Sequence, residues 1–309
     1  MFAVNEEPYC LWGADISAQT RDFLDGLDAE YFEYSIKVHM EAEDEQRASV
    51  ALSIALHHAL ETLFSLLCAF VQAPDCPHAW IAKCSNGDLR ALLARISKCE
   101  RHIFTKLSIS SVTWIKIAES VFKTFKPGTD QQKEMINGFG RLWARLAMEV
   151  VDPNRVDEYN SLKHGLRVRQ GGFAIAVGLE PSCGVVPPPE QMKVLGKSKF
   201  GSSFFTVEPA IRERGNRSIL AKHICINWSM ERIVLLNQLA YISISNIISA
   251  LRIINGASSC KFLLPSDSED FERPWTYSPG VTRMALGDIV EDVPITTKGQ
   301  LQGMLKPKT

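Results

Sequence analysis

Hydrophobic positions along the chain recur mainly at helical spacing. Residues 47–73 are apolar on nearly every face until Pro74 interrupts them. A helix that is apolar all round is typical of the centre of a helical bundle. Residues 88–103 and 130–151 instead place their apolar residues on one face, which predicts amphipathic helices packed around that centre.

Two further segments complete the predicted bundle. Residues 17–44 carry apolar side chains at roughly helical spacing among many acids, which predicts one or two helices with a solvated acidic face. Residues 218–255 form the longest predicted helix, and Gly256 is suited to end it.

The pattern changes to alternation after Gly165. Residues 166–177 and 199–208 alternate apolar and polar positions, with three consecutive prolines, 187–189, between them. This predicts a small β-hairpin or meander over 166–210. Two short strands alone are marginally stable, so we expect this insertion to pack against the helices.

These segments predict a mainly α fold, a helical bundle with an inserted β-hairpin and an irregular C-terminal tail. We expect an N-terminal lead-in with amphipathic helices over 1–46, the bundle over 47–256 and the tail over 257–309, where Pro, Gly, Ser and Asp dominate.

A membrane span is the main alternative for the two most apolar helices. His57, His58 and Glu61 lie in the middle of the first, where a carboxylate in hydrocarbon would be costly. Six Asn, Gln and Ser residues interrupt the uncharged stretch 233–251 in the second. Both therefore favour bundle helices, and we expect no membrane association.

Composition and charge narrow the class of protein further. The chain has 309 residues, 46% of them hydrophobic and 22% charged, with a net charge of −1. Such a chain is globular and lacks a global electrostatic signal for nucleic acid, so any such patch is local. The acidic N-terminus lacks the pattern of a secretory signal, and together with unpatterned cysteines it predicts a cytoplasmic protein.

Known cofactor and metal motifs do not occur. The eight cysteines form no C-x2-C pair. The sequence motifs of phosphate-binding loops, dinucleotide-binding folds, α/β-hydrolases and zinc proteases are also missing. Cys76 and His78 are close, but Cys84 and Cys99 follow at irregular spacing. We predict no metal site and no cofactor.

Residues 152–169 concentrate the candidate reactive groups. Asp152 and Pro153 are a strong helix start, and Gly165 is a helix stop. The helical step then places Asn160 and His164 on one outward face with Lys163 beside them. Tyr159, Leu162 and Leu166 form the opposite, buried stripe. Arg167 and Arg169 fall on one face of the strand that follows.

This arrangement resembles the HEPN families (higher eukaryotes and prokaryotes nucleotide-binding), which are helical bundles. In them an arginine, commonly followed by a polar residue, precedes a histidine, and dimerisation forms a metal-independent ribonuclease site. Asn160 and His164 match the polar residue and the histidine, whereas Tyr159 stands at the arginine position. The resemblance covers at most 47–165 and 218–255.

The tyrosine at position 159 matters because, in the HEPN families, the guanidinium of the arginine at this position would hold the scissile phosphate. Lys163, Arg167 and Arg169 are the cations that could take its place, and the alternative is a domain that binds without cutting. In the HEPN families four to six residues separate the arginine from the histidine. Two other pairs have this spacing, Arg95 with His102 and Arg217 with His223, and chance alone accounts for about one such match.

The resemblance predicts a HEPN-like homo-oligomer that binds or cleaves RNA or a nucleotide, in bacterial defence or stress response. We assign catalysis to His164, Asn160 and Arg167, with His164 as acid or base. We assign substrate binding to Lys163, Arg169, Glu61 and His57. The alternative is a non-catalytic helical module that assembles with a protein partner.

A third hypothesis concerns the histidines of the first apolar helix. Glu61 follows His57 by four residues and His58 by three, so the three side chains can meet on one face. They either fix the register of the bundle or form the site of a small-molecule enzyme.

Overall fold

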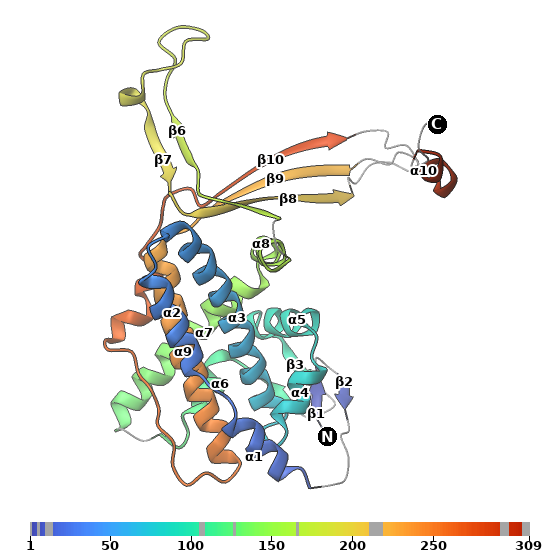
Figure 1. Cartoon of the computed structure of the whole chain (residues 1–309). Coiled ribbons are helices and arrows are strands. Elements are labelled where there is room, and N and C mark those ends of the chain that lie inside the picture. Colours follow the sequence, from blue (N-terminus) through green and yellow to red (C-terminus); the bar gives the residue numbers. More distant parts are fainter. Residues whose placement is uncertain are drawn as a thin grey trace.

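The computed structural model describes residues 2–4, 7–9, 15–104, 109–125, 128–164, 167–209, 219–290 and 297–304. Helices dominate, and a small antiparallel sheet lies across one end of the bundle (Figure 1). The mainly α class with a β insertion is therefore confirmed. The predicted helix stop at Gly165, the buried position of Leu166 and the pair partner Arg217 lie outside the described residues.

The predicted helices occur in the predicted order, but the helix expected over 88–103 ends at Ser97, and residues 101–104 form a strand. The helices of the described residues are α1 Ser17–Asp25, α2 Glu30–Met40, α3 Glu45–Gln72, α4 Pro77–Lys83, α5 Asn86–Ser97, α6 Trp114–Val121, α7 Thr129–Val151, α8 Pro153–Lys163, α9 Met230–Ile254 and α10 Lys298–Met304. Short 3-10 turns occur at Pro189–Gln191, Ser268–Phe271 and Arg273–Trp275.

The strands form one four-stranded sheet and three hairpins. Their bounds are β1 Phe2–Val4, β2 Glu7–Tyr9, β3 Arg101–Phe104, β4 Ile109–Ser111, β5 Val168–Gln170, β6 Ala174–Val177, β7 Lys193–Lys197, β8 Gly201–Pro209, β9 Ile219–Asn227 and β10 Arg283–Val290. The sheet has the order β10-β9-β8-β5 with antiparallel neighbours, and β1–β2, β3–β4 and β6–β7 pair separately.

The long helices α3 and α9 form the centre of the bundle. Their polar residues bond inside it: Asn237 Nδ2 donates to the Leu52 carbonyl at 3.1 Å, and Trp143 Nε1 donates to Ser243 Oγ at 3.0 Å. These bonds tie α9 to α3 and to α7. Ser245 bonds within α9, and Asn246 and Ser249 donate to backbone carbonyls of the segment that follows α9. The asparagine and serine residues that interrupt this apolar sequence thus have hydrogen-bond partners.

Both central helices are also long and apolar enough to cross a membrane. In their most apolar windows, 56% of α3 residues and 67% of α9 residues are buried within the structure. Core helices of water-soluble proteins meet the same criteria, so the two helices give no argument for a membrane.

A second hydrophobic cluster joins the sheet to the bundle. Phe204 and Ile224 face each other across β8 and β9 and, with Ile226 and Trp228, pack against residues of α2, α3, α8 and α9. The predicted packing of the β insertion on the helices is confirmed.

The predicted start of the last long helix is wrong. Residues 219–227 form β9, which pairs with β8 on one side and β10 on the other, and α9 begins only at Met230. The apolar residues of β9 resemble the start of a helix, but their conformation depends on the two neighbouring strands. The C-terminal tail contributes β10, a strand that the sequence pattern did not predict.

Candidate functional site

Helix α8 organises the region that the sequence singled out. Asp152 caps it by accepting a hydrogen bond from the Asn154 backbone N–H at 3.0 Å, and Pro153 occupies its first turn. The helix ends at Lys163, with His164 as the C-cap. The predicted start is confirmed.

The two faces of α8 have opposite environments. Tyr159 and Leu162 are buried, whereas Asn160, Lys163 and His164 are exposed. The helix contacts α3 and α7 on one side and β8 on another. The polar side chains therefore point away from the core, as the helical spacing predicts.

Tyr159 is fixed from the interior by α3. Its ring stacks on His57 with centroids 4.7 Å apart, and His58 approaches its edge. Its hydroxyl donates to Glu61 Oε2 at 3.2 Å, and Asn86 Nδ2 donates to Glu61 Oε1 at 2.8 Å. Tyr159 is thus a packing residue that joins α8 to α3.

The predicted site residues therefore separate into two groups. His57 and Glu61 contact the buried side of α8, through Tyr159, whereas Asn160 and His164 lie on its exposed side. The structure does not bring the two groups together around one substrate. The expected meeting of His57, His58 and Glu61 does occur, around Tyr159.

Burial shifts the pKa values of His57 and Tyr159. Desolvation of the ring, followed by the positive charge of Arg155, lowers the pKa of His57 to about 3. Burial and then Glu61 raise the pKa of Tyr159 above its ordinary value. Both side chains are therefore neutral near pH 7, and the pKa of His57 is too low for an efficient base there.

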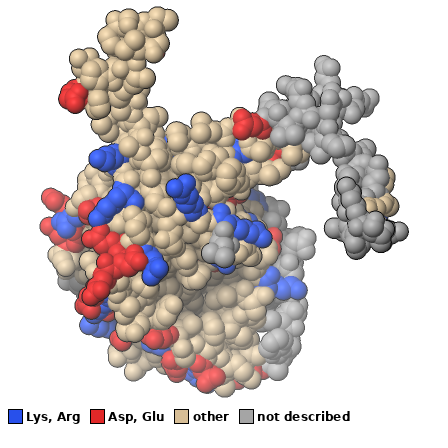
Figure 2. Space-filling view, turned by 45° about the horizontal axis from the view of Figure 1, so that its top comes forward, with Lys and Arg blue, Asp and Glu red and all other residues tan. Residues whose placement is uncertain are grey.

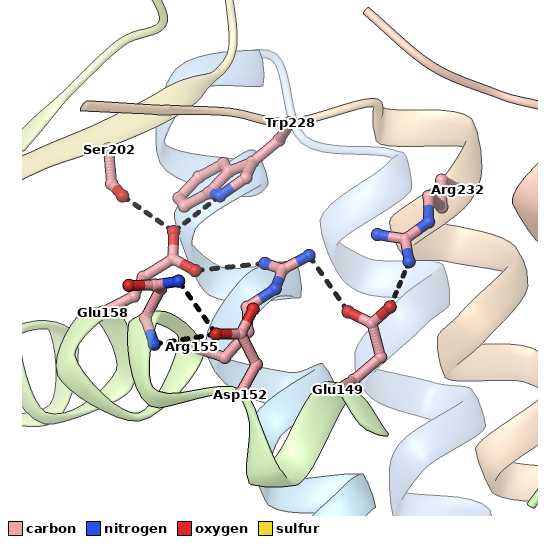
Figure 3. Close-up of polar contacts among 8 residues, drawn as sticks. Glu149, Asp152, Arg155, Glu158, Ser202, Trp228 and Arg232 are labelled. Carbon is pink, nitrogen blue, oxygen red and sulfur yellow. Dashed lines mark hydrogen bonds and ion pairs between the residues drawn. The ribbon is translucent and has the colours of Figure 1, made fainter. Parts of the chain in front are cut away.

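A buried ionic network lies next to this group and was not predicted. Glu158, which is fully buried, accepts hydrogen bonds from Ser202 Oγ and Trp228 Nε1, both at 2.7 Å, through Oε1 (Figure 3). Its Oε2 lies 3.1 Å from Arg155 Nη1. One carboxylate of α8 is thus bonded to β8 and to the residue that follows β9.

The network continues from Arg155 into the bundle. Arg155 Nη2 lies 3.2 Å from Glu149 Oε2, and Arg232 binds the other oxygen of Glu149. Although burial opposes it, Arg155 and Arg232 hold the pKa of Glu149 below its ordinary value. Two carboxylates and two guanidinium groups balance in charge, so this network has little capacity to attract a ligand.

An adjoining cavity shares these arginines. It has a volume of about 310 Å³ and lies where α8 and α9 begin. Glu149 neutralises part of the charge of Arg155 and Arg232, whereas Arg283, also in its lining, has no ion-pair partner among the described residues. Asp152 lines the same cavity and Asp157 interacts electrostatically with Arg283, so carboxylates partly compensate all three arginines.

The exposed cations near the end of α8 form a different environment. We define the cation cluster as Lys163, Arg167 and Arg169, which are all exposed and lie within seven residues of sequence. Lys163 Nζ lies 4.9 Å from the Tyr159 ring. Among the described residues none of the three has an ion-pair partner.

Arg169 has a defined orientation. It pairs with Ser203 across β5 and β8, while the adjacent Ser202 points inward to Glu158. Because neighbouring strand residues point to opposite faces, Arg169 lies on the outer face of the sheet. The cation cluster therefore extends from α8 to the outer face along the β5 edge.

The other arginine–histidine pairs remain predictions. The side chain of His102 and all of Arg217 lie outside the described residues. His223 stacks on Phe205 with ring centroids 4.6 Å apart, on β9 and β8.

The described residues contain no group of three or more His, Cys, Asp or Glu that could hold a metal ion. Cys76 contacts His78 at 3.7 Å between Sγ and Nε2. Every cysteine in the described ranges is a free thiol.

Comparisons with protein-family models, with curated proteins and with solved structures found no match. The resemblance to the HEPN families stays a prediction from Asn160 and His164.

Proposed function

We propose that the protein binds the phosphate backbone of single-stranded RNA at the cation cluster and does not cleave it. The observation that carries the proposal is the contrast between two sets of cations. Arg155 and Arg232 are neutralised by carboxylates, whereas Lys163, Arg167 and Arg169 are exposed and without ion-pair partners among the described residues.

Exposed cations suit a polyanion for a physical reason. Each phosphate that a lysine or arginine neutralises releases condensed counterions, so several cations close together add to the affinity. The five cavities that we characterise among the described residues include none of Lys163, His164, Arg167 or Arg169 in their linings. An open surface of this kind favours a nucleic-acid backbone over an enclosed small nucleotide.

The end of α8 partly opposes this attraction. The carboxyl end of a helix carries about half a negative charge, which disfavours a bound phosphate. Three full positive charges outweigh that partial charge, and Arg169 lies on the sheet, away from the helix end.

The geometry supports binding more than cleavage. Tyr159, at the position where the resemblance implies an arginine, is buried and donates to Glu61, so it holds no substrate phosphate. His164 has no hydrogen-bond partner among the described residues that would orient its ring. A general base is normally oriented by such a partner.

Fluorescence anisotropy with a labelled oligouridine tests the proposal. Replacing Lys163, Arg167 and Arg169 together by glutamine is expected to weaken RNA affinity by about tenfold or more. The matched control replaces Lys98, Lys123 and Lys133 by glutamine, which removes the same charge from other exposed positions and leaves the affinity within about twofold. Equal affinities of the two triple variants would contradict the proposal.

The same RNA distinguishes binding from cleavage. Gel analysis after incubation with the wild-type protein is expected to show intact RNA. Cleavage that disappears in the variant His164→Ala would replace the binding proposal with the nuclease hypothesis.

A further inference from the structure

Residues 173–198 form a projecting β arm whose tip is apolar. Strands β6 and β7 pair antiparallel and carry this arm away from the bundle (Figure 1). Leu179 is 91% exposed and Val186 is 75% exposed, and Val177 and Val194 are half exposed. An isolated two-stranded hairpin is at best marginally stable in water, so an apolar tip of this kind indicates a partner surface.

The root of the arm is held firmly. Asn227, which is buried, accepts from the Phe173 N–H at 2.7 Å and donates to the carbonyls of Phe173 and Val281. The Lys197 N–H donates to the Pro279 carbonyl at 3.0 Å. The fold therefore fixes the direction of the arm at its base and directs its tip away from the body.

The outer face of the sheet is a second apolar surface. Phe205 is 73% exposed, Val207 66% and Leu286 59%. These residues belong to β8 and β10 and alternate with residues that face the bundle, such as Phe204. No element among the described residues covers this face.

The two surfaces resemble each other in polarity, each having an apolar centre. Charged residues border both surfaces: Glu180 and Glu190 lie near the tip of the arm, and Arg169 of β5 and Asp288 of β10 lie on the outer face. Figure 2 shows that the arm and the top of the sheet are mostly uncharged, whereas acidic residues gather on one side of the body. An apolar centre with a polar rim is typical of protein interfaces, and both surfaces have that form.

We propose that the arm and the outer sheet face bind a second copy of this chain, the arm of each protomer lying on the outer face of the other. Two-fold contacts use the same patches on both subunits, and this chain supplies both halves of such a contact. Because the root bonds direct the arm away from its own sheet, the apolar tip is available to a partner. This proposal does not rest on RNA binding.

Light scattering coupled to size exclusion tests the proposal at micromolar protein concentration. The wild-type chain is expected at twice the 34.5 kDa mass of one chain. The variant Leu179→Ser/Val186→Ser changes only exposed side chains at the tip and is expected to shift to the mass of one chain. Circular dichroism should show the same helix content as in the wild-type protein.

A control variant at another exposed apolar site shows whether the change in mass is specific to the arm. Tyr34 and Val38 are exposed apolar residues of α2, and Tyr34→Ser/Val38→Ser is expected to remain dimeric. A wild-type chain that is monomeric, or a tip variant that remains dimeric, would overturn the proposal. A heterologous partner for the arm would then be the remaining explanation of the apolar tip.

Discussion

At the scale of single residues, Tyr159 and Glu158 are neighbours on α8 that are buried by different parts of the chain. Tyr159 donates to Glu61 of α3, whereas Glu158 accepts from Ser202 and Trp228. Helical spacing alone predicts that Tyr159 and Leu162 are buried and that Asn160 and His164 are exposed. The burial of Glu158 could not be predicted in the same way. Its partners Ser202 and Trp228 are 44 and 70 residues away in sequence, and a carboxylate is buried only where such partners meet it.

The low pKa of His57 leads to a prediction for pH. In the unfolded chain the pKa is near 6.5, and in the folded protein it is about 3. Between these values the unfolded state binds more protons, so this residue lowers the free energy of unfolding as pH falls from about 6.5 towards 3. The limiting slope is roughly 1.4 kcal/mol per pH unit.

Urea unfolding at several pH values measures this effect. The variant His57→Phe keeps a ring against Tyr159 but cannot titrate, so its stability should fall less steeply than that of the wild-type protein between about pH 6 and 4. His58→Phe is the neighbouring control. Parallel curves for wild type and His57→Phe would show that His57 is not held neutral by the fold.

At the scale of elements, the start of α8 was predicted from local signals, whereas strands β9 and β10 were not predicted. Asp152 and Pro153 are local signals, and α8 begins where they place it. Strand β9 has no such signal, because its conformation depends on pairing with β8 and β10. The same long-range contacts bring Glu158 of α8 under the sheet.

The network around Glu158 is the polar link between α8 and the sheet. In Glu158→Gln an uncharged amide replaces the carboxylate, and Arg155 keeps Glu149 as its only ionic partner among the described residues. Breaking a buried ion pair on one side typically costs about 3–5 kcal/mol, so we expect a loss of about 3 kcal/mol in the free energy of unfolding.

Urea unfolding monitored by circular dichroism checks this value. The control Glu190→Gln removes an exposed carboxylate of the β arm and should change stability by about 0.5 kcal/mol or less. A Glu158→Gln protein as stable as this control would mean that the network does not hold α8 to the sheet.

At the scale of the whole molecule, local sequence patterns account for the bundle, whereas long-range contacts set the direction of the β arm. The helical bundle and the packing of the β insertion follow from apolar periodicity, which is local in sequence. The direction of the arm and the position of Arg169 on the outer face could not be predicted, because both depend on strand register and on the bonds of Asn227. Together the elements place the cation cluster at the β5 edge, beside the proposed dimer surface.

The salt dependence of RNA binding tests the central claim most directly. For single strands each phosphate contact contributes about 0.7 to the slope of log affinity against log salt concentration. Replacing Lys163, Arg167 and Arg169 by glutamine should therefore make the slope shallower by about 2, while the triple control at Lys98, Lys123 and Lys133 keeps the wild-type slope. An unchanged slope in the first variant would show that these cations do not contact RNA phosphates.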